Sequence, residues 1–308
     1  MTDGNPTYEV DRLVLHKELG LGRILLLEGP KATVYFRDLA GARPEDAIRK
    51  INTNIVPLQE APSQSDPILD NLPPYTNGKF KRPVRRRVTL DEGIEKFRSH
   101  YPLFFEDPKY LGDLHKGERV YKWTAHELFQ RELGDGKLGR LLRDGHLDEA
   151  RKHALAVEGR MNVLSLYETA AFRDALKDDA AAKRYLDALE LILAGSHVEQ
   201  SSFERYLDIV AGLPSKEGKT SPAKWTVATI LPFLAKPSQF MFLKPEVTQD
   251  CAARLMFDVQ YSTQLNWTTY AKVLEMSDYL LDVLRQYGAR DYIDVQSFIW
   301  LIGAAWKD

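Results

Sequence analysis

The sequence holds a single cysteine among its 308 residues, Cys251. One thiol can form neither an intramolecular disulfide nor a cysteine-based zinc site, so both devices are excluded, and we expect a reducing compartment. Cys251 lies in Asp250–Leu255, a stretch typical of a helix interior that contains no histidine to activate a thiol. We therefore interpret it as a buried structural residue and not as a nucleophile.

Long hydrophobic runs and an export signal are also missing. No apolar stretch approaches the ~20 residues that a membrane-spanning helix needs. The first residues, Met1–Pro6, contain neither a basic segment nor the apolar core of a secretory signal. The sequence therefore predicts a cytoplasmic protein without a membrane partner.

A strong excess of charge of either sign is absent. The formal net charge is −2, with 28% charged and 44% hydrophobic residues, as in an ordinary soluble protein. Residues 1–88 hold 14 Lys and Arg against 11 Asp and Glu, whereas the remainder holds 28 against 33. Neither part resembles a surface covered with phosphate-binding charge. The length exceeds that of a usual single core, so we expect two domains.

Motifs that would identify an enzyme are missing as well. No Gly-x-x-x-x-Gly-Lys-Ser/Thr phosphate loop occurs, and the seven histidines form no His-Glu-x-x-His pattern, so we expect no metal and no cofactor. Asp291 and Asp294 could hold Mg²⁺ in a nuclease. Asp294 is also well placed to cap the last helix, and we favour that interpretation.

Residues 9–59 show the alternation typical of β-strands. In Lys31–Arg37, Ala32, Val34 and Phe36 point to one face while the intervening residues point to the other. Glu28–Lys31 supplies a turn that joins this strand to the preceding apolar run. Together with shorter pieces at Ile48–Ile51 and Ile55–Leu58, the pattern predicts a small SH3-like barrel of five short strands over residues 8–60.

Residues 61–88 interrupt this pattern and predict an extended, proline-rich linker. It ends in a basic run, residues 79–87, where six of nine residues are Lys or Arg. Clustered cations beside an aromatic ring can hold phosphates while the ring stacks on a base. The alternative is a solvated linker end that balances the acidic helical region. The candidate nucleic-acid-binding residues are Lys79, Phe80, Lys81, Arg82, Arg85, Arg86 and Arg87.

Helical patterns dominate from residue 89 to residue 308. Thr89 and Glu92 have the spacing of a capping box, which predicts a helix start. No repeat of constant period occurs, so an irregular all-α domain is expected rather than a solenoid. Amphipathic segments predict further helices at about 119–133, 137–143, 147–157, 162–177, 179–194, 201–211, 223–235, 246–256, 267–287 and 294–306.

One short motif resembles a known family. His16-Lys17-x-x-Gly20-x-Gly22, followed by Ile24 and a later Val-Tyr-Phe, resembles the Tudor-like module of UvrD/PcrA-type bacterial helicases and, more loosely, the RNA-polymerase-interacting domain of CarD-like proteins. The resemblance implies a bacterial docking module for RNA polymerase or transcription-coupled repair. On the family pattern, His16 and Lys17 are candidate partner contacts; a polar rim at a barrel corner is the alternative. The two glycines are interpreted as structural, through positive φ or close strand approach.

The sequence as a whole predicts an α+β protein with a Tudor- or SH3-like barrel at 8–60, a linker at 61–88 and an α-helical domain at 89–308. Its expected function is non-catalytic docking onto RNA polymerase or DNA-repair proteins, with direct DNA or RNA contact in addition. Two alternatives stay open: a nucleic-acid-processing enzyme with its site in the helical domain, and an accessory scaffold unrelated to nucleic acid.

Overall fold

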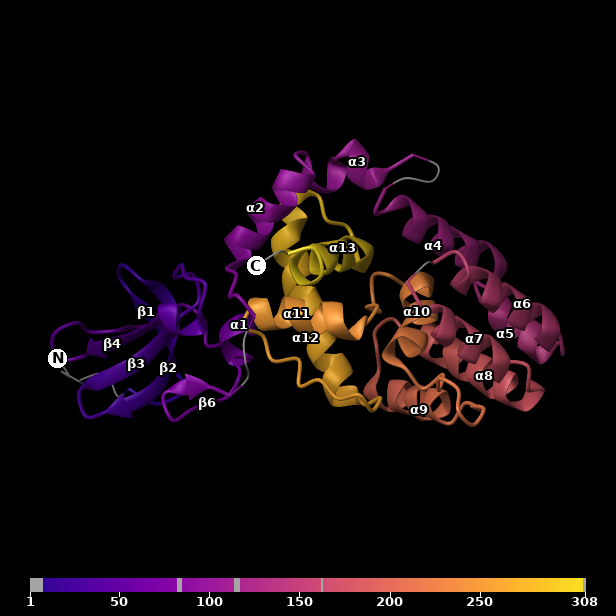
Figure 1. Cartoon of the computed structure of the whole chain (residues 1–308), viewed down its shortest axis with the longest axis horizontal. Helices are drawn as coiled ribbons and strands as arrows, with labels where there is room; N and C mark the ends of the chain where they lie inside the picture. Colours follow the sequence, from indigo (N-terminus) through magenta and orange to yellow (C-terminus); the bar gives the residue numbers. More distant parts are fainter. Residues whose placement is uncertain (1–7, 82–84, 114–116, 162, 307–308) are drawn as a thin grey trace. The chain divides into compact units, whose positions relative to one another are not determined.

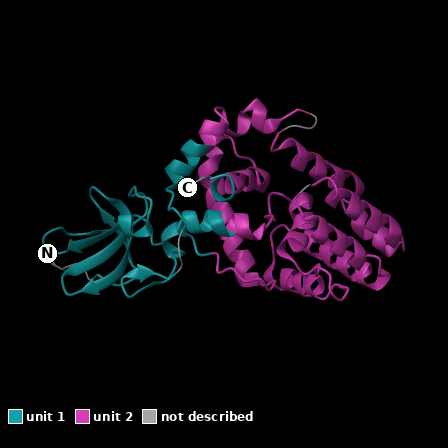
Figure 2. Cartoon of the chain, in the orientation of Figure 1, with its two compact units in different colours: residues 1–96, 249–258, 302–308 teal, residues 97–248, 259–301 magenta. Residues whose placement is uncertain are grey.

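The computed structural model describes residues 8–81, 85–113, 117–161 and 163–306. They divide into two compact units (Figure 2), which we call the sheet unit and the helical unit. The sheet unit comprises residues 1–96, 249–258 and 302–308, and the helical unit comprises residues 97–248 and 259–301. A small antiparallel sheet followed by a helical region confirms the predicted mixed composition (Figure 1). None of the described helices is long and apolar enough to cross a bilayer.

The N-terminal sheet is antiparallel, with the strand order β4-β3-β2-β1-β5. Strands β2, β3 and β4 lie where the alternation predicts them. The fifth was expected at Ile55–Leu58, but Ile55 is 75% exposed, and the pairing with β1 is made by Gln59 and Glu60. The strands are β1 (Leu13–His16), β2 (Gly20–Glu28), β3 (Lys31–Phe36), β4 (Ile48–Asn52) and β5 (Gln59–Glu60).

The two glycines of the opening hairpin have separate structural reasons. Gly20 has a φ of +79°, which side-chain-bearing residues rarely adopt. At Gly22, a Cβ atom would lie 2.7 Å from Cγ1 of Val34 and 2.8 Å from Cδ1 of Phe36. Gly20 therefore permits the turn, and Gly22 permits the close packing of β2 on β3, in agreement with both structural interpretations.

Both faces of this sheet are apolar and both are covered. On one face, Val34 and Phe36 pack with Ile24 in a fully buried cluster. On the other face, Tyr35 is 1% exposed and packs with Leu69 in a second cluster. The alternation along β3 therefore separates two buried faces and not a buried face from a solvated one.

The cover of the second face comes from the segment that was predicted to be an extended linker. It contains α1 (Pro67–Asp70) and a two-stranded hairpin, β6 (Tyr75–Thr76) and β7 (Lys79–Phe80). Asp66 caps α1 by accepting from the N–H groups of two of its residues. Because Leu69 and Phe80 enter the cluster around Tyr35, residues 61–81 are part of the sheet unit and not a linker.

The predicted helices are observed with small shifts at their ends. Thr89 and Glu92 form the expected capping box, each side chain accepting from the other's backbone N–H at 3.2 and 2.7 Å. The remaining short helices are η1 (Pro44–Ala47), η2 (Phe104–Glu106) and η3 (Arg285–Tyr287). The longer ones are α2 (Leu90–His100), α3 (Pro108–Leu111), α4 (Val120–Glu132), α5 (Lys137–Arg143), α6 (Leu147–Glu158), α7 (Leu166–Ala175), α8 (Asp179–Ala194), α9 (Gln200–Ala211), α10 (Trp225–Ala235), α11 (Pro245–Arg254), α12 (Trp267–Leu284) and α13 (Tyr292–Gly303).

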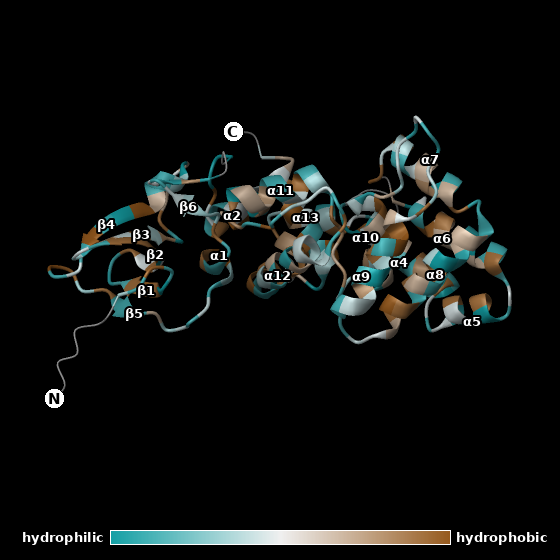
Figure 3. Cartoon of the chain, turned by 90° about the horizontal axis from the view of Figure 1, so that it is seen from below, coloured by the Kyte–Doolittle hydropathy of each residue, from teal (hydrophilic) through white to brown (hydrophobic). Residues whose placement is uncertain are grey.

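The core of the helical unit is organised around α10. All of its residues are buried, and it packs against α4, α6, α8 and α9. Hydrophobic and hydrophilic residues alternate along the surrounding helices (Figure 3), as expected for helices with one buried face. Because α10 is apolar on every side, other helices have to cover it on every side. This requirement places α4, α6, α8 and α9 around it.

Candidate functional site

His16 and Lys17, the predicted partner contacts, lie at the turn between β1 and β2. The His16 ring is 9% exposed, and its Nδ1 accepts from the backbone N–H groups of Glu18 and Leu19, both at 3.1 Å. Its edge packs on the ring of Phe36 at a centroid distance of 5.8 Å. His16 therefore stabilises its own hairpin, and of the pair only Lys17 is exposed to solvent.

Arg87, the last residue of the basic run, is buried in the sheet unit with 1% exposure. Its guanidinium donates to the hydroxyl of Tyr35 at 2.7 Å and to the carbonyl oxygen of Leu39 at 2.6 Å. A third bond reaches the carbonyl oxygen of Arg37 at 2.5 Å, and the guanidinium lies 5.4 Å from the centre of the Tyr35 ring. This arginine fastens the residues after the hairpin to the end of β3, so it is not available to a phosphate.

Phe80, the aromatic residue of the run, is 6% exposed. It packs edge-on against Tyr35 and Tyr75, with centroid distances of 5.7 and 5.1 Å. In this position the ring cannot stack on a base. Its neighbours Lys79 and Lys81 are exposed, whereas Arg82 lies outside the described residues.

Of the arginines of the run that the structure describes, Arg85 and Arg86 reach the surface of the sheet unit. Arg85 forms an ion pair with Asp250 at 3.0 Å and keeps 54% of its side chain exposed. Arg86 lies 3.9 Å from a Glu92 oxygen and 5.7 Å from the ring centre of Trp306. The described residues of the run thus separate into a buried part, Phe80 and Arg87, and an exposed part, Lys79, Lys81, Arg85 and Arg86.

The sheet unit also exposes large apolar side chains. Ile55 is 75% exposed, and Val56 beside it is 40% exposed. Both lie in the connection between β4 and β5, the two strands at the edges of the sheet order. Val10 and Leu26 are exposed by 47% and 41%. Sequence reasoning missed Ile55 and Val56 as surface residues, because two adjacent β-branched residues are typical of a buried strand.

The helical unit buries an ion-pair network between α4 and α13. Arg119, with 7% exposure, donates to both oxygens of Asp291, at 3.0 and 2.7 Å, and to Asp294 at 2.6 Å. Burial opposes the charge of Arg119, but the two carboxylates outweigh it and keep the pKa of Arg119 above its ordinary value. Burial is the main cause that raises the pKa of the Asp294 carboxyl. The hydrogen bonds of the network are therefore satisfied, but burying its charges costs desolvation free energy.

The prediction that Asp294 caps the last helix is wrong. The helix α13 begins at Tyr292, and the Asp291 carboxylate accepts from the N–H of Ile293 at 2.9 Å. Asp291 is therefore the capping residue, and Asp294 lies inside the first turn, where it accepts from Tyr110 and Arg119. The two aspartates therefore have different roles at the start of the same helix. The spacing of three residues could not show these roles, because Arg119, the partner of Asp291, is 172 residues away in the sequence.

A serine–lysine pair lies beside this network. The Nζ atom of Lys122 is 2.7 Å from Oγ of Ser297 and 3.3 Å from an oxygen of Glu118. Burial is the main cause that lowers the pKa of Lys122 to about 8. Such a pair is the arrangement of a nucleophile and its base. However, Lys122 and Ser297 are 1% and 2% exposed and line neither described cavity of this unit, so a substrate has no described route to them.

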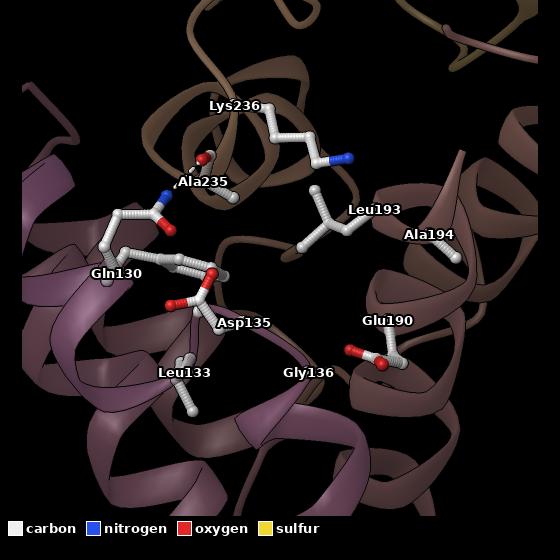
Figure 4. A pocket seen from close by; sticks show the side chains of 11 residues that line it. Gln130, Leu133, Asp135, Gly136, Glu190, Leu193, Ala194, Ala235 and Lys236 are labelled. Carbon is white, nitrogen blue, oxygen red and sulfur yellow. Dashed lines mark hydrogen bonds between the residues drawn. The ribbon is translucent and has the colours of Figure 1, made fainter. Parts of the chain in front are cut away.

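Two of the cavities on the described part of the helical unit have a defined lining. The larger measures about 860 Å³ and is lined mainly by α3, the residues that follow it and those that precede α4. Its lining includes two tyrosines, Tyr101 and Tyr121, together with Lys109 and Glu118. These aromatic, basic and acidic side chains do not indicate one class of ligand. The smaller measures about 290 Å³ and lies at the ends of α4, α8 and α10 (Figure 4). Among the described residues, no group of three or more His, Cys, Asp or Glu side chains is placed to hold a metal ion.

Comparisons with protein-family models, with curated proteins and with solved structures find no match to this chain.

Proposed function

We propose that this chain is a non-catalytic interaction protein that docks through its sheet unit onto nucleic-acid machinery, RNA polymerase or a DNA-repair complex. The observation that carries the proposal is the exposed pair Ile55 and Val56, with 75% and 40% exposure. Adjacent large apolar side chains at the surface of a small unit are typical of protein-binding sites. The resemblance of the His16–Ile24 stretch to polymerase-docking modules gives the partner class.

The strand edges support the same proposal. In the order β4-β3-β2-β1-β5, the connection that carries Ile55 and Val56 links the two outer strands. A sheet edge can pair with an extended segment of a partner, and exposed apolar side chains beside it then add specificity. We further infer that the five strands curl into a partly open Tudor- or SH3-like barrel, in which the outer strands β4 and β5 are not paired with each other. The buried cluster around Ile24, Val34 and Phe36 supports this inference.

Direct nucleic-acid contact is proposed as an addition to docking. It rests on the exposed part of the basic run, Lys79, Lys81, Arg85 and Arg86. Four cations are few for a main binding site, but they suffice to hold the phosphates of a nucleic acid that the machinery already presents. Buried Phe80 and Arg87 take no part.

The docking proposal is tested with the complete chain, because the sheet unit includes residues 249–258 and 302–308. Bacterial RNA polymerase core enzyme and a reconstituted DNA-damage-recognition complex are immobilised, and binding is measured by surface plasmon resonance. We expect saturable binding to one of them and a loss of at least about tenfold in the double variant Ile55→Ser, Val56→Ser.

The matched control is Leu166→Ser with Tyr167→Ser, an adjacent pair on α7 with 87% and 76% exposure. These changes remove a comparable exposed apolar surface from the helical unit and are expected to leave binding unchanged. Absence of binding to both complexes, or equal losses in the two double variants, would contradict docking through the sheet unit.

The nucleic-acid addition has its own test. Fluorescence anisotropy with single- and double-stranded 20-mers is measured between 50 and 200 mM salt. We expect weak binding that falls steeply with salt and is lost when Arg85 and Arg86 are replaced by Gln. Lys183→Gln, a surface lysine of the helical unit, serves as control. Salt-insensitive or absent binding would rule out direct contact while leaving the docking proposal intact.

A further inference from the structure

Three cationic side chains surround the ring of Trp306 in the sheet unit. The charged groups of Arg86, Lys96 and Arg254 lie 5.7, 5.8 and 6.0 Å from the centre of this ring. All four residues belong to the sheet unit. Indole is the strongest aromatic partner for a cation, because the face of its ring is electron-rich. The cluster therefore combines a large aromatic surface with three positively charged hydrogen-bond donors.

Hydrogen bonds to the end of α11 hold the cluster in place. The N–H of Val88 donates to the carbonyl oxygen of Arg254 at 2.9 Å. Arg254 in turn donates from Nη1 to the carbonyl oxygen of Arg86 at 3.3 Å. These bonds fasten the end of the basic run to α11 and bring together two arginines that are 168 positions apart. The sequence could not show that Trp306 lies beside the basic run, because this contact depends on residues from three distant segments.

The outer part of the cluster reaches solvent. Arg86 keeps 42% of its side chain exposed, and Lys96 and Trp306 are both partly exposed. Arg254 is 2% exposed and therefore forms the inner side of the cluster. Carbon atoms in contact are about 3.5–4 Å apart, so none of the three charged groups is stacked directly over the ring centre. A planar ligand can therefore approach the part of the indole that faces solvent.

Carboxylates near the cluster offset much of its charge. Glu92 lies 3.9 Å from Arg86, and Asp250 is paired with Arg85 at 3.0 Å. Two further carboxylates are exposed on α2, those of Asp91 and Glu95. The cluster is therefore not a surface of strong positive potential. What distinguishes it from the other charged parts of the sheet unit is the aromatic ring beside the arginines.

We propose that Trp306 is the base-stacking residue of a single-stranded nucleic-acid site, in which Arg85 and Arg86 hold the phosphates. This inference rests on the direct nucleic-acid contact proposed above and names the form of nucleic acid that the contact selects. Phe80, the aromatic residue of the basic run, is buried, whereas Trp306 brings a larger ring to the exposed end of the same run. Bases of a single strand are free to stack on such a ring, whereas those of a duplex are already stacked on one another.

Fluorescence anisotropy of the complete chain tests the inference with two labelled single strands of equal length. One is an ordinary DNA strand, and the other consists of abasic sites, so it carries the same phosphates without bases. At the same salt concentration, we expect the ordinary strand to bind about tenfold more tightly, because only its bases can stack on Trp306. Equal binding of the two strands would overturn the inference and leave the proposed nucleic-acid contact in place, since that contact requires phosphates alone.

The variant Trp306→Leu locates the stacking contact. It removes the ring but keeps an apolar side chain, so it is expected to weaken binding of the ordinary strand about tenfold and to leave the abasic strand unaffected. Stacking releases no counterions, so the salt dependence of binding is expected to stay as in the unchanged protein. Replacing Arg85 and Arg86 by Gln is expected to reduce that salt dependence. Equal weakening of both strands by Trp306→Leu would indicate a change in folding or charge and overturn the stacking role.

Two further variants separate stacking from folding effects. Trp306→Phe keeps a smaller ring and is expected to retain most of the preference for the ordinary strand over the abasic one. Trp300→Leu changes a tryptophan of the helical unit with 38% exposure and is expected to bind like the unchanged protein. Equal losses in Trp300→Leu and Trp306→Leu would overturn the site. Absence of binding of every oligonucleotide to the unchanged protein would overturn both this inference and the nucleic-acid contact, but not the docking proposal.

Discussion

The sheet unit and the helical unit each bury an arginine almost completely, and they satisfy it with different partners. Arg87 of the sheet unit is surrounded by neutral acceptors, a tyrosine hydroxyl and backbone carbonyl groups. Arg119 of the helical unit is paired with two carboxylates, Asp291 and Asp294. The first arginine fastens a chain segment to a strand end, and the second joins two helices through opposite charges.

The difference teaches how the two units divide their tasks. The sheet unit uses Arg87 of its basic run as an internal fastener and covers both faces of its sheet, while Ile55 and Val56 stay exposed in a loop. The helical unit places its strongest charges inside and keeps cavities at helix ends. The proposed surface for a protein partner lies on the sheet unit.

The largest effect is expected from Arg119→Met. The change leaves the Asp291 and Asp294 carboxylates buried without a counter-ion, which costs about 3–5 kcal/mol. Urea unfolding monitored by circular dichroism measures the loss. Replacing both aspartates by Asn in the same variant is expected to recover part of it. A loss below about 1 kcal/mol for Arg119→Met would show that the network contributes little.

Arg87→Met tests the buried arginine of the sheet unit. It leaves the Tyr35 hydroxyl and two carbonyl groups without their donor, so we expect a loss of about 3 kcal/mol, with no unpaired charge left behind. The same unfolding measurement applies. Arg86→Met is the control, since Arg86 reaches the surface, and is expected to cost below about 1 kcal/mol. Equal losses at the two positions would contradict the division of the basic run into a buried and an exposed part.

Lys122 makes the helical unit sensitive to alkaline pH. Its pKa is lowered by burial from the ordinary value of 10.5 to about 8. Between these values the unfolded chain holds the proton more often than the folded protein, so stability rises with pH. Across this interval the free energy of unfolding of the protein is expected to rise on the order of 2–3 kcal/mol more than that of the Lys122→Met variant. Unfolding from pH 7 to 9.5 checks it, and a parallel pH dependence in both proteins would contradict it.

The smallest effect is expected from Arg85→Gln. Its ion pair with Asp250 is largely solvated, with 54% of the arginine side chain exposed, and such pairs contribute about 0–1 kcal/mol. We therefore expect unchanged thermal stability together with reduced oligonucleotide binding. A destabilisation above about 2 kcal/mol would place Arg85 among the structural residues beside Arg87.

Local sequence patterns predicted most helices and strands. The roles of the buried charged residues depend on partners that are distant in the sequence, so the sequence did not predict them. The capping box at Thr89, the glycines of the first hairpin and the amphipathic helices could be predicted because their causes lie within a few residues. The folding of residues 61–81 could not, since it depends on the second face of β3 needing Leu69 and Phe80 as cover. The roles of Arg119 and Lys122 were missed for the same reason: their partners on α13 are about 170 residues away.

Hydrogen–deuterium exchange of the complete chain, with and without RNA polymerase core or the repair complex that binds it, tests the central claim most directly. The account predicts added protection in the sheet unit, concentrated around Ile55, Val56 and the strands β4 and β5. The helical unit is expected to exchange as in the free protein. Protection confined to residues 97–248 and 259–301 would contradict docking through the sheet unit.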